Sequence, residues 1–505
     1  MGRYILGLDC GNTAIKAALL DMEGVELASH ASTIETLFPH PGHTELDMSR
    51  LWQQCCEVIR QVLKETEISG DQIGAIGVSG HGNGAYLLDK RHQPLLGIQS
   101  LDSRATDLVA DIQSGVKIAE IRELNRQGVW ASQTATLLSW LKKNQPETYH
   151  QTGTVFFCKD YLNFCLTGER YTDYSDLSAS GLFDFPRHQV SKELLTLLDI
   201  QEITEAIPTP VHSDEVIGKL STQAAEESGL DAGTPVIAGM IDVIASALGA
   251  GVWDENDASI VTGTWSINQV VTNKLPDKRL FMTCLFPDNR YLAIESSATS
   301  ASNLEWFVQE FFQFEKAQLS VGENIFELCN QLVENVEISE TLPLFHPYLY
   351  GSGDNGAARG NFFDLAGWHK KAHLLYAVYE GIVFGHLEHV NKLRTANIGF
   401  TKALLSGGGA RSQFWCQLFA DVLNIDIHIT QCNEAGAKGV AMAAAHATGQ
   451  FLSFEVAVKA MRSPVQVFTP EPTHQATLKK RYDRYLKVSD WINHFGTSPQ
   501  GNKEP

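Results

Sequence analysis

The sequence predicts an α/β protein made of two domains with a ligand-binding cleft between them. Its 505 residues exceed what one ordinary hydrophobic core holds. Each half opens with a strand, a short polar turn and a second strand, the first near Tyr4 and the second near Ser259, and strands then mix with helices. A repeated unit of this kind indicates a duplicated α/β fold with a cleft between the halves.

The first half begins with three predicted strands. The first is apolar, the second follows a polar, glycine-bearing turn, and the third follows Glu23-Gly24. Apolar residues at helical spacing predict a helix over Leu51–Lys64. The predicted strands are Tyr4–Asp9, Ile15–Asp21, Val25–Ile34 and Ile73–Ser79, and the predicted helices are Leu51–Lys64 and Ala131–Asn144.

An apolar stretch between residues 235 and 253 has the length of a membrane span. However, Asp242 lies near its middle, where a charge costs about 2.5–3.5 kcal/mol on insertion scales. We therefore predict a buried strand followed by a packed helix over Val243–Gly249. Asp242 is then either the N-cap of that helix or a functional carboxylate.

The second half repeats the alternation of strands and helices. Its predicted strands are Ser259–Thr264, Ser266–Thr272, Ala403–Ser406 and Asp426–Thr430, and its predicted helices are Arg411–Asn424 and Glu434–Thr448. The division that follows is an N-terminal domain over residues 1–250 and a C-terminal domain over residues 251–495. Residues 496–505 are predicted to be a disordered tail.

Composition and charge exclude some classes of function. A net charge of −20 disfavours nucleic-acid binding and attraction to anionic lipid surfaces. The nine cysteines form no CxxC pair, so we expect buried thiols in a reducing, cytoplasmic environment. The N-terminus lacks the pattern of a signal peptide, because its apolar stretch ends at Asp9.

A polar turn containing Gly11, Asn12 and Thr13 follows the first predicted strand, and Lys16 lies just beyond it. Backbone N–H groups of such turns can bind phosphate. Asp9, at the end of the strand, can hold Mg²⁺ through water, since Mg²⁺ favours one or two carboxylates plus substrate phosphates. An ordinary hairpin turn has the same composition, so this turn alone does not decide between the two interpretations.

A second polar turn, with Gly263 and Thr264, opens the other half. Taken alone, it is equally open to the hairpin interpretation. Two such turns, one in each half, point more strongly to function, because a cleft between duplicated domains can present both turns to one triphosphate.

Three consecutive glycines, Gly407, Gly408 and Gly409, lie between a predicted strand and a predicted helix near Ser412. Glycines permit close backbone approach, and a helix N-terminus favours an anion or a flat base. Three glycines exceed what a tight strand–helix turn needs, so we favour a ligand here. The sequence lacks the GxxxxGK[ST] motif, which excludes a P-loop kinase.

Asp242 is the remaining candidate for chemistry. A carboxylate in an apolar, glycine-rich stretch is desolvated, which raises its pKa. A raised pKa suits a general base that takes a proton from a hydroxyl group. A helix cap is the alternative, and one residue can serve both purposes.

Taken together in this order, these motifs resemble the FGGY carbohydrate kinases of the actin/hexokinase-like superfamily. The resemblance runs from about Tyr4 to about Pro472. Besides the loops above, it rests on Lys159-Asp160-Tyr161-Leu162, Thr172-Asp173-Tyr174-Ser175-Asp176, Gly360-Asn361-Phe362-Phe363 and Ala377-Val378-Tyr379-Glu380. It implies two actin-like (ribonuclease H-like) domains with an interdomain cleft, ATP and Mg²⁺ as cofactors, and a homodimer as a common assembly. Leu137 departs from the family's first signature, which has a Lys there.

The resemblance also implies roles for individual residues. Asp242 is the catalytic base, and Asp9 holds Mg²⁺ through water. The substrate lies near His81, Gly82, Asp102 and Asp242; phosphate and ATP lie near Gly11, Asn12, Thr13, Lys16, Gly263, Thr264, Gly408, Gly409 and Ser412.

The substrate is a small sugar, and a ketopentose is favoured. His81-Gly82 is similar to the xylulose kinases, and Gly263-Thr264-Trp265 with Asn303–Phe307 and Trp368 resembles the L-xylulose kinases. D-xylulose, ribulose and a polyol such as glycerol or erythritol remain alternatives. An actin-like ATPase or assembly protein is the alternative from another class.

Overall fold

The computed structural model describes residues 2–320, 322–352, 358–430 and 432–495. They form two compact units, each built from separate stretches of chain. Unit 1 comprises Met1–Glu255, Val271–Ala293 and Gln431–Ser463, and unit 2 comprises Asn256–Val270, Ile294–Thr430 and Pro464–Pro505. The domains predicted from the sequence divide the chain once, near residue 250, and stay predictions. The predicted tail, 496–505, lies outside the described residues.

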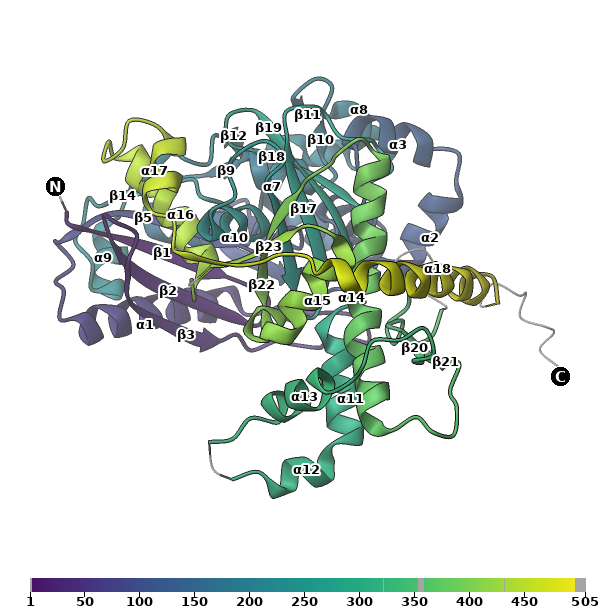
Figure 1. Cartoon of the computed structure of the whole chain (residues 1–505). Coiled ribbons are helices and arrows are strands. Elements are labelled where there is room, and N and C mark those ends of the chain that lie inside the picture. Colours follow the sequence, from purple (N-terminus) through teal and green to yellow (C-terminus); the bar gives the residue numbers. More distant parts are fainter. Residues whose placement is uncertain (1, 321, 353–357, 431, 496–505) are drawn as a thin grey trace. The chain divides into compact units, whose positions relative to one another are not determined.

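The central sheet of unit 1 has the strand order β13-β14-β5-β1-β2-β3, with β15 also paired to β5. The pairs β1–β2 and β2–β3 are antiparallel, whereas β1, β14 and β15 run parallel to β5. Helix α1 packs against β2 and β3 (Figure 1). The bounds are β1 (Tyr4–Cys10), β2 (Ala14–Asp21), β3 (Glu26–Thr33), β5 (Ile73–Gly80), β13 (Val216–Lys219), β14 (Pro235–Ile237), β15 (Met240–Ile241) and α1 (Met48–Thr66).

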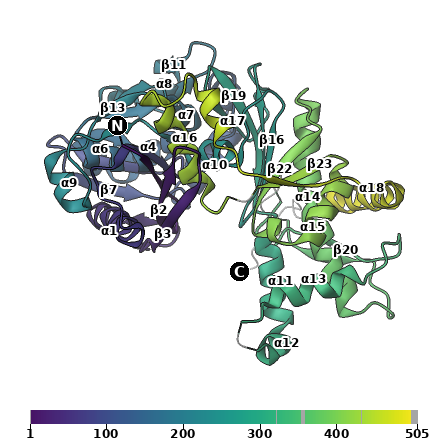
Figure 2. The same cartoon turned by 60° about the vertical axis from the view of Figure 1, so that its left-hand side comes forward.

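Helix α16 (Ala435–Ala447) comes from the C-terminal part of the sequence but belongs to unit 1, where it packs against β1 and β5 (Figure 1) and against α10 (Asp242–Ala250) (Figure 2). Glycine makes this close approach possible. A Cβ atom at Gly7 would lie 2.0 Å from the carbonyl oxygen of Ala437, and one at Gly439 would lie 1.9 Å from that of Ala245. Any side chain at these two positions would push the helix away from the sheet or from α10.

A second apolar core of unit 1 contains Leu137, which lies on α4 (Thr134–Asn144) and is fully buried beside Leu138 and Leu141. The position at which the family's signature has Lys is therefore a core position here. The other elements that begin in unit 1 are β4 (Glu45–Leu46), β6 (Ala85–Asp89), β7 (Pro94–Ile98), α2 (Thr106–Ser114), α3 (Ile118–Asn125), α5 (Pro146–Gln151), β8 (Thr152–Phe156), α6 (Cys158–Thr167), β9 (Tyr171–Asp173), α7 (Tyr174–Ala179), β10 (Phe183–Asp184), β11 (Gln189–Val190), α8 (Lys192–Leu197), η1 (Gln201–Ala206), β12 (Thr209–Val211), α9 (Thr222–Ser228), β18 (Met282–Phe286), β19 (Arg290–Ser297) and α17 (Phe454–Ala460).

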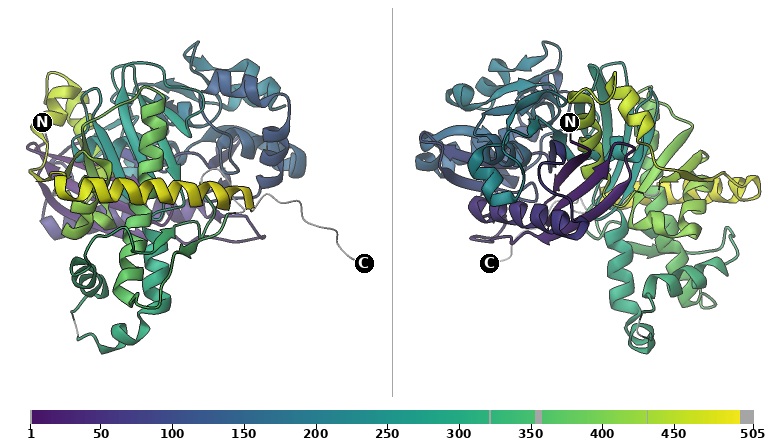
Figure 3. Two further views of the ribbon diagram at one scale, coloured as in Figure 1. Left: turned by 45° about the vertical axis from the view of Figure 1, so that its right-hand side comes forward. Right: turned by 90° about the vertical axis from the view of Figure 1, so that its left-hand side faces the viewer.

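In unit 2, the sheet runs in the order β17-β16-β22-β23-β24. Strands β16, β22 and β23 are parallel, and β17 and β24 are antiparallel to their neighbours. The long helix α18, drawn in yellow in Figure 3, packs against α15 and β20. The bounds are β16 (Ala258–Thr262), β17 (Ser266–Thr272), α11 (Ala301–Phe311), α12 (Gln313–Gln318), α13 (Ile325–Glu334), β20 (Leu344–His346), β21 (Asn361–Phe363), α14 (Lys371–Thr395), β22 (Lys402–Gly407), η2 (Gly408–Arg411), α15 (Gln413–Leu423), β23 (Asp426–Thr430), β24 (Val465–Phe468) and α18 (Pro472–Phe495).

The expected strands and helices are confirmed with small shifts at their ends. The apolar stretch from residue 235 forms β14, β15 and α10, and none of the described helices is long and apolar enough to cross a membrane. One expectation is wrong in detail. Asp242 is the first residue of α10, and the N-cap position belongs to Ile241, so Asp242 does not cap the helix.

Candidate active site

Three parallel strands of unit 1 bring the candidate carboxylates together. In the register of the sheet, Asp9 on β1 lies opposite Ser79 on β5, and Met240 on β15 also lies opposite Ser79. The carboxyl ends of β1, β5 and β15 therefore meet at one edge of the sheet. His81 follows β5 directly, and Asp242 follows β15. This edge is where an open α/β sheet ordinarily binds its ligand.

Asp9 is half-buried and is held by its neighbours at this edge. The hydroxyl of Ser79 donates a hydrogen bond of 2.6 Å to Oδ1 of Asp9. Burial raises the pKa of Asp9, and Ser79 and Lys16 offset part of that rise. Lys16 itself forms an ion pair of 2.9 Å with Glu434, which directly precedes α16. A Cβ atom at Gly436 would lie 2.6 Å from the Asp9 carboxylate, so only glycine leaves it room.

Asp242 has the protonation behaviour of a base that works near neutral pH. It is half-buried, and its pKa is raised to about 7, first by desolvation and then by the Asp9 carboxylate. His81 acts in the opposite direction on this pKa. A carboxyl group with a pKa near 7 is a competent proton acceptor at physiological pH.

His81 and Gly82 lie beside Asp242 in the loop after β5. Burial alone would lower the pKa of His81, but Cys158 and Asp242 raise it more. Its Nε2 lies 2.8 Å from the hydroxyl oxygen of Tyr86. A Cβ atom at Gly82 would lie 2.1 Å from Cδ1 of Ile241, so the loop needs glycine there.

The carboxylate of Asp102, predicted from the sequence to lie near the substrate, is held by neighbouring residues. Its Oδ2 accepts a 2.7 Å hydrogen bond from the backbone of Thr44, and Arg104 donates to both of its oxygens at 2.9 Å. The loop that carries it is joined to the first polar turn, because Asn12 donates a 2.9 Å hydrogen bond to Ser100. Its part in substrate binding stays a prediction.

The first polar turn is a tight hairpin between β1 and β2. The backbone N–H of Gly11 donates to the carbonyl oxygen of Ala14 at 3.0 Å, and Gln99 donates to the carbonyl of Asn12 at 2.6 Å. Thr13 is exposed at the tip. The two anchored residues thus present Thr13 on a fixed turn.

In unit 2, Thr262 joins the second polar turn to the glycine run. Thr262 ends β16 opposite Gly407 on β22, and its hydroxyl accepts a 2.9 Å hydrogen bond from the backbone of Gly409. Gly407 has a φ of 86° and Gly408 begins the 3-10 turn η2. Gly263 directly follows Thr262, so the structure brings Gly263 together with Gly408 and Gly409.

Thr264 and Ser412 have fixed places around this pair of loops. The carbonyl oxygen of Thr264 accepts a 3.0 Å hydrogen bond from Ser302. Ser412 is the N-cap of α15, where its hydroxyl accepts from the backbone of Trp415 at 3.1 Å and donates to Asn330 at 2.8 Å. The glycine run and a capped helix N-terminus form the kind of backbone surface that binds phosphate or a base.

These residues form two chemical groups. Unit 1 carries a half-buried carboxyl group of raised pKa beside a second carboxylate, and unit 2 carries a glycine-lined loop before a helix. Comparison with protein families identifies the chain to which these groups belong. The model of the N-terminal domain of the FGGY family of carbohydrate kinases matches residues 4–249, and the model of the C-terminal domain matches residues 258–448. The chain belongs to the FGGY family of carbohydrate kinases.

Relatives of this FGGY kinase align along nearly the whole chain. It is 37% identical to the L-xylulose/3-keto-L-gulonate kinase of Escherichia coli (strain K12), over 96% of each chain. It is 32% identical to a probable L-xylulose kinase of Haemophilus influenzae, over 97% of this chain and 99% of that one. The crystal structure of a xylulose kinase from Rhodospirillum rubrum superposes with a TM-score of 0.89 at 26% identity, covering 98% of this chain and 100% of that one. The FGGY kinase is therefore an ATP-dependent sugar kinase with the two-domain actin-like fold.

The sequence alone did not identify several residues of the FGGY kinase that hold its site. Ser79 and Glu434 contact Asp9 and Lys16, and Asn330 accepts from Ser412. The contact of Ser79 could have been predicted, since Ser79 ends the predicted strand Ile73–Ser79 and Asp9 ends the predicted strand Tyr4–Asp9, and the two strands are parallel. Glu434 and Asn330 lie far along the chain from their partners, Lys16 and Ser412. No local pattern signals such contacts.

Proposed function

We propose that this FGGY kinase transfers the γ-phosphoryl group of ATP to a hydroxyl of a ketopentose, with L-xylulose as the first candidate. Family membership supports a sugar kinase over an actin-like assembly protein. The names of the relatives in E. coli and H. influenzae support L-xylulose over D-xylulose, ribulose, glycerol or erythritol. The observation that carries the proposal is Asp242, a half-buried carboxyl group whose pKa of about 7 fits a base, at the edge where Asp9 also lies.

The proposed reaction uses unit 1 for the sugar and the proton. His81, Gly82 and Asp102 position the sugar, and the Asp242 carboxylate accepts the proton of the attacking hydroxyl. The sugar oxygen forms a bond to the γ-phosphorus while the bond from that phosphorus to the β–γ bridging oxygen breaks, which releases ADP. Positioning and charge stabilisation account for most of the rate enhancement in reactions of this type.

Nucleotide binding is assigned to backbone groups and a few side chains. Gly408, Gly409 and Ser412 hold the nucleoside part of ATP. The phosphates are held by the two polar turns and by Lys16; the residues are Gly11, Asn12, Thr13, Gly263 and Thr264. Because Lys16 is paired with Glu434, we infer that it serves partly to fix the turn.

Mg²⁺ fits the carboxylates at this edge. Asp9 and Asp242 are close enough that the charge of Asp9 raises the pKa of Asp242, and a divalent cation near Asp9 would relieve that repulsion. Among the described residues, no group of three or more His, Cys, Asp or Glu side chains could hold a metal alone. Mg²⁺ binds one or two carboxylates together with substrate phosphates and water. When bound, Mg²⁺ neutralises charge on the phosphates.

The pH dependence of the reaction follows from Asp242. The base acts only in its ionised form, and its pKa is about 7, so kcat/KM rises with pH through 7 and then levels off. At pH 6 we expect a rate below the plateau by at most about tenfold, because roughly one Asp242 in eleven is ionised at a pKa of about 7 and Mg²⁺ near Asp9 would raise that fraction. Steady-state rates with saturating Mg·ATP between pH 5.5 and 8.5 check this. A flat profile across that range would remove Asp242 as the titrating base.

The substrate is tested by ADP release with Mg·ATP across a panel of L-xylulose, D-xylulose, L- and D-ribulose, glycerol, erythritol and gluconate. We expect L-xylulose to give the highest kcat/KM, by tenfold or more, since a missing polar contact in a buried site costs about one to three kcal/mol. A higher kcat/KM with another sugar would leave the assignment as a sugar kinase intact and would replace L-xylulose as the proposed substrate. Release of ADP that no sugar or polyol stimulates would contradict the proposal.

Two finer expectations accompany this function as proposals. One is a cytoplasmic location, which agrees with nine free cysteines. The other is a homodimer, which rests on the family resemblance alone.

A further inference from the structure

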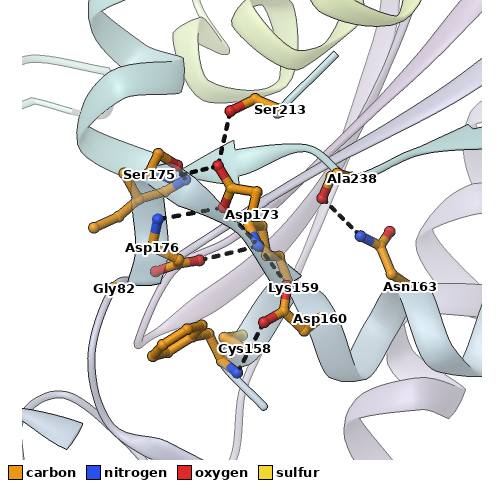
Figure 4. A network of polar contacts seen from close by, with 12 residues as sticks. Gly82, Cys158, Lys159, Asp160, Asn163, Asp173, Ser175, Asp176, Ser213 and Ala238 are labelled. Atoms are coloured by element: carbon orange, nitrogen blue, oxygen red, sulfur yellow. Dashed lines mark hydrogen bonds and ion pairs between the residues drawn. The ribbon is translucent and has the colours of Figure 1, made fainter. Parts of the chain in front are cut away.

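A buried cluster of charged residues lies close to the segment that carries the proposed base, Asp242. The proposed mechanism assigns no role to this cluster. Lys159, on α6, forms ion pairs with Asp173 at 2.9 Å, with Asp176 at 3.3 Å and with Asp160 (Figure 4). All four side chains are at most 1% exposed. The cluster therefore places one ammonium and three carboxyl groups in the interior of unit 1.

The protonation of the cluster reflects this imbalance. Burial alone would lower the pKa of Lys159, but the three carboxyl groups raise it above its ordinary value. Burial raises the pKa of Asp176 well above its ordinary value, and Lys159 offsets only part of the rise. Buried ion pairs are weak sources of stability, and apolar side chains often replace them without loss. The arrangement is better explained by the geometry that it imposes.

The cluster reaches the proposed base through two hydrogen bonds. Oδ2 of Asp173 accepts from the backbone of Ser175 at 2.8 Å and from the hydroxyl of Ser213 at 2.7 Å. The hydroxyl of Ser175 then accepts a 3.0 Å hydrogen bond from the backbone N–H of Ile241. Ile241 is the N-cap residue of α10, and Asp242 is the next residue. One serine hydroxyl thus links the cluster to the backbone that carries the base.

Neighbouring contacts strengthen this link. Asn163, on the same helix as Lys159, donates a 2.8 Å hydrogen bond to the carbonyl of Ala238, just before β15 (Figure 4). The side chain of Ile241 fills the space that a side chain at Gly82 would need. Helix α6 and the start of α7 therefore hold both ends of the segment between residues 238 and 241.

We propose that Ser175, held by the Lys159–Asp173 pair, is a positioning residue that fixes the Asp242 carboxylate through the backbone of Ile241. The inference rests on the proposed role of Asp242 as the base. A misplacement of about 1 Å in a reacting group can lower a rate by about 10²-fold. Loss of this hydroxyl should therefore reduce kcat while leaving the nucleotide loops of unit 2 unchanged.

The test compares Ser175→Ala with Ser175→Thr and Ser180→Ala. Ser180 is a matched control, because it is also buried, is the C-cap of α7, and its hydroxyl donates to Leu177 and accepts from Leu182. We expect Ser175→Ala to lower kcat by about 10- to 100-fold with a KM for ATP within about twofold. Ser175→Thr should restore kcat to within about threefold, since threonine keeps the hydroxyl that accepts from Ile241.

A double variant separates positioning from general destabilisation. If Ser175 acts through Asp242, then Ser175→Ala combined with Asp242→Asn is no slower than Asp242→Asn alone. Two results would overturn the inference and leave the kinase assignment intact. One is an equal loss of kcat in Ser175→Ala and Ser180→Ala. The other is a double variant whose loss of kcat is the product of the losses in the two single variants. Near-normal kcat in Asp242→Asn alone would instead overturn the proposed base, and this inference with it.

Discussion

Replacing Asp242 by Asn is expected to lower kcat by roughly 10³-fold, since a positioned general base contributes about 10²–10⁴-fold. The amide keeps the size of the carboxyl group but cannot accept the proton of the attacking hydroxyl. ATP binding should stay near its normal value, because the nucleotide loops lie on other elements. Single-turnover rates and nucleotide titration with the same protein sample measure both quantities.

The stability of Asp242→Asn separates lost chemistry from lost folding. The folded protein raises the pKa of Asp242 from 3.8 to about 7, so the stability tied to its protonated form is lost as pH rises through 7. At pH 8, Asn removes an ionised carboxylate that is partly desolvated, and the thermal unfolding midpoint of the variant should equal or exceed that of the wild type. Near-normal turnover in this variant would show that another group is the base.

Replacing Gly436 by Ala is expected to lower kcat by about 10²-fold. The new methyl group would lie 2.6 Å from the Asp9 carboxylate, which is closer than two such groups can approach. Asp9 must then leave its place beside Ser79, and a displacement of about 1 Å has this scale of effect on rate. Because Asp9 is proposed to hold Mg²⁺, the variant should also need more Mg²⁺ for half-maximal rate, which a Mg²⁺ titration at fixed ATP measures.

Gly399→Ala is the matched control for this variant. Gly399 has no atom within 4 Å of an added Cβ, so the same substitution there should leave kcat within about twofold. Alanine favours helix over glycine by about 1 kcal/mol, so Gly436→Ala should not unfold α16 by itself. Normal activity and normal Mg²⁺ dependence in Gly436→Ala would show that Asp9 has no part in the reaction.

The sequence predicts the parts of this fold whose signals are local. The strands around the first polar turn, and the strand–helix segment around Asp242, follow from apolar runs interrupted by glycine and a single charge. The raised pKa of Asp242 was predictable for the same reason, since an apolar stretch desolvates whatever carboxylate it contains. The glycines at 407–409 were recognisable because a strand and a helix lie on either side.

Other features depend on contacts between distant parts of the chain. Nothing near Glu434 shows that it pairs with Lys16, and nothing near Ser175 shows that it holds Ile241. The interpretation of Asp242 as a helix cap failed by one position, because a cap depends on backbone angles that composition does not specify. Nothing in the sequence near Asp102 shows that Thr44 also donates to its carboxylate.

Helix α16 has a consequence for how the protein is made. It covers β1 and β5, yet it leaves the ribosome only after more than 430 residues have been synthesised. Until then, the glycine-lined groove at Gly7 and Gly77 has no helix to fill it, and the new chain carries an open apolar face. Chains that fold from the N-terminus as they emerge are prone to aggregate through such faces. Ribosome-bound fragments that end before residue 435 should therefore associate with holding chaperones, and release should follow once residues 435–447 have emerged.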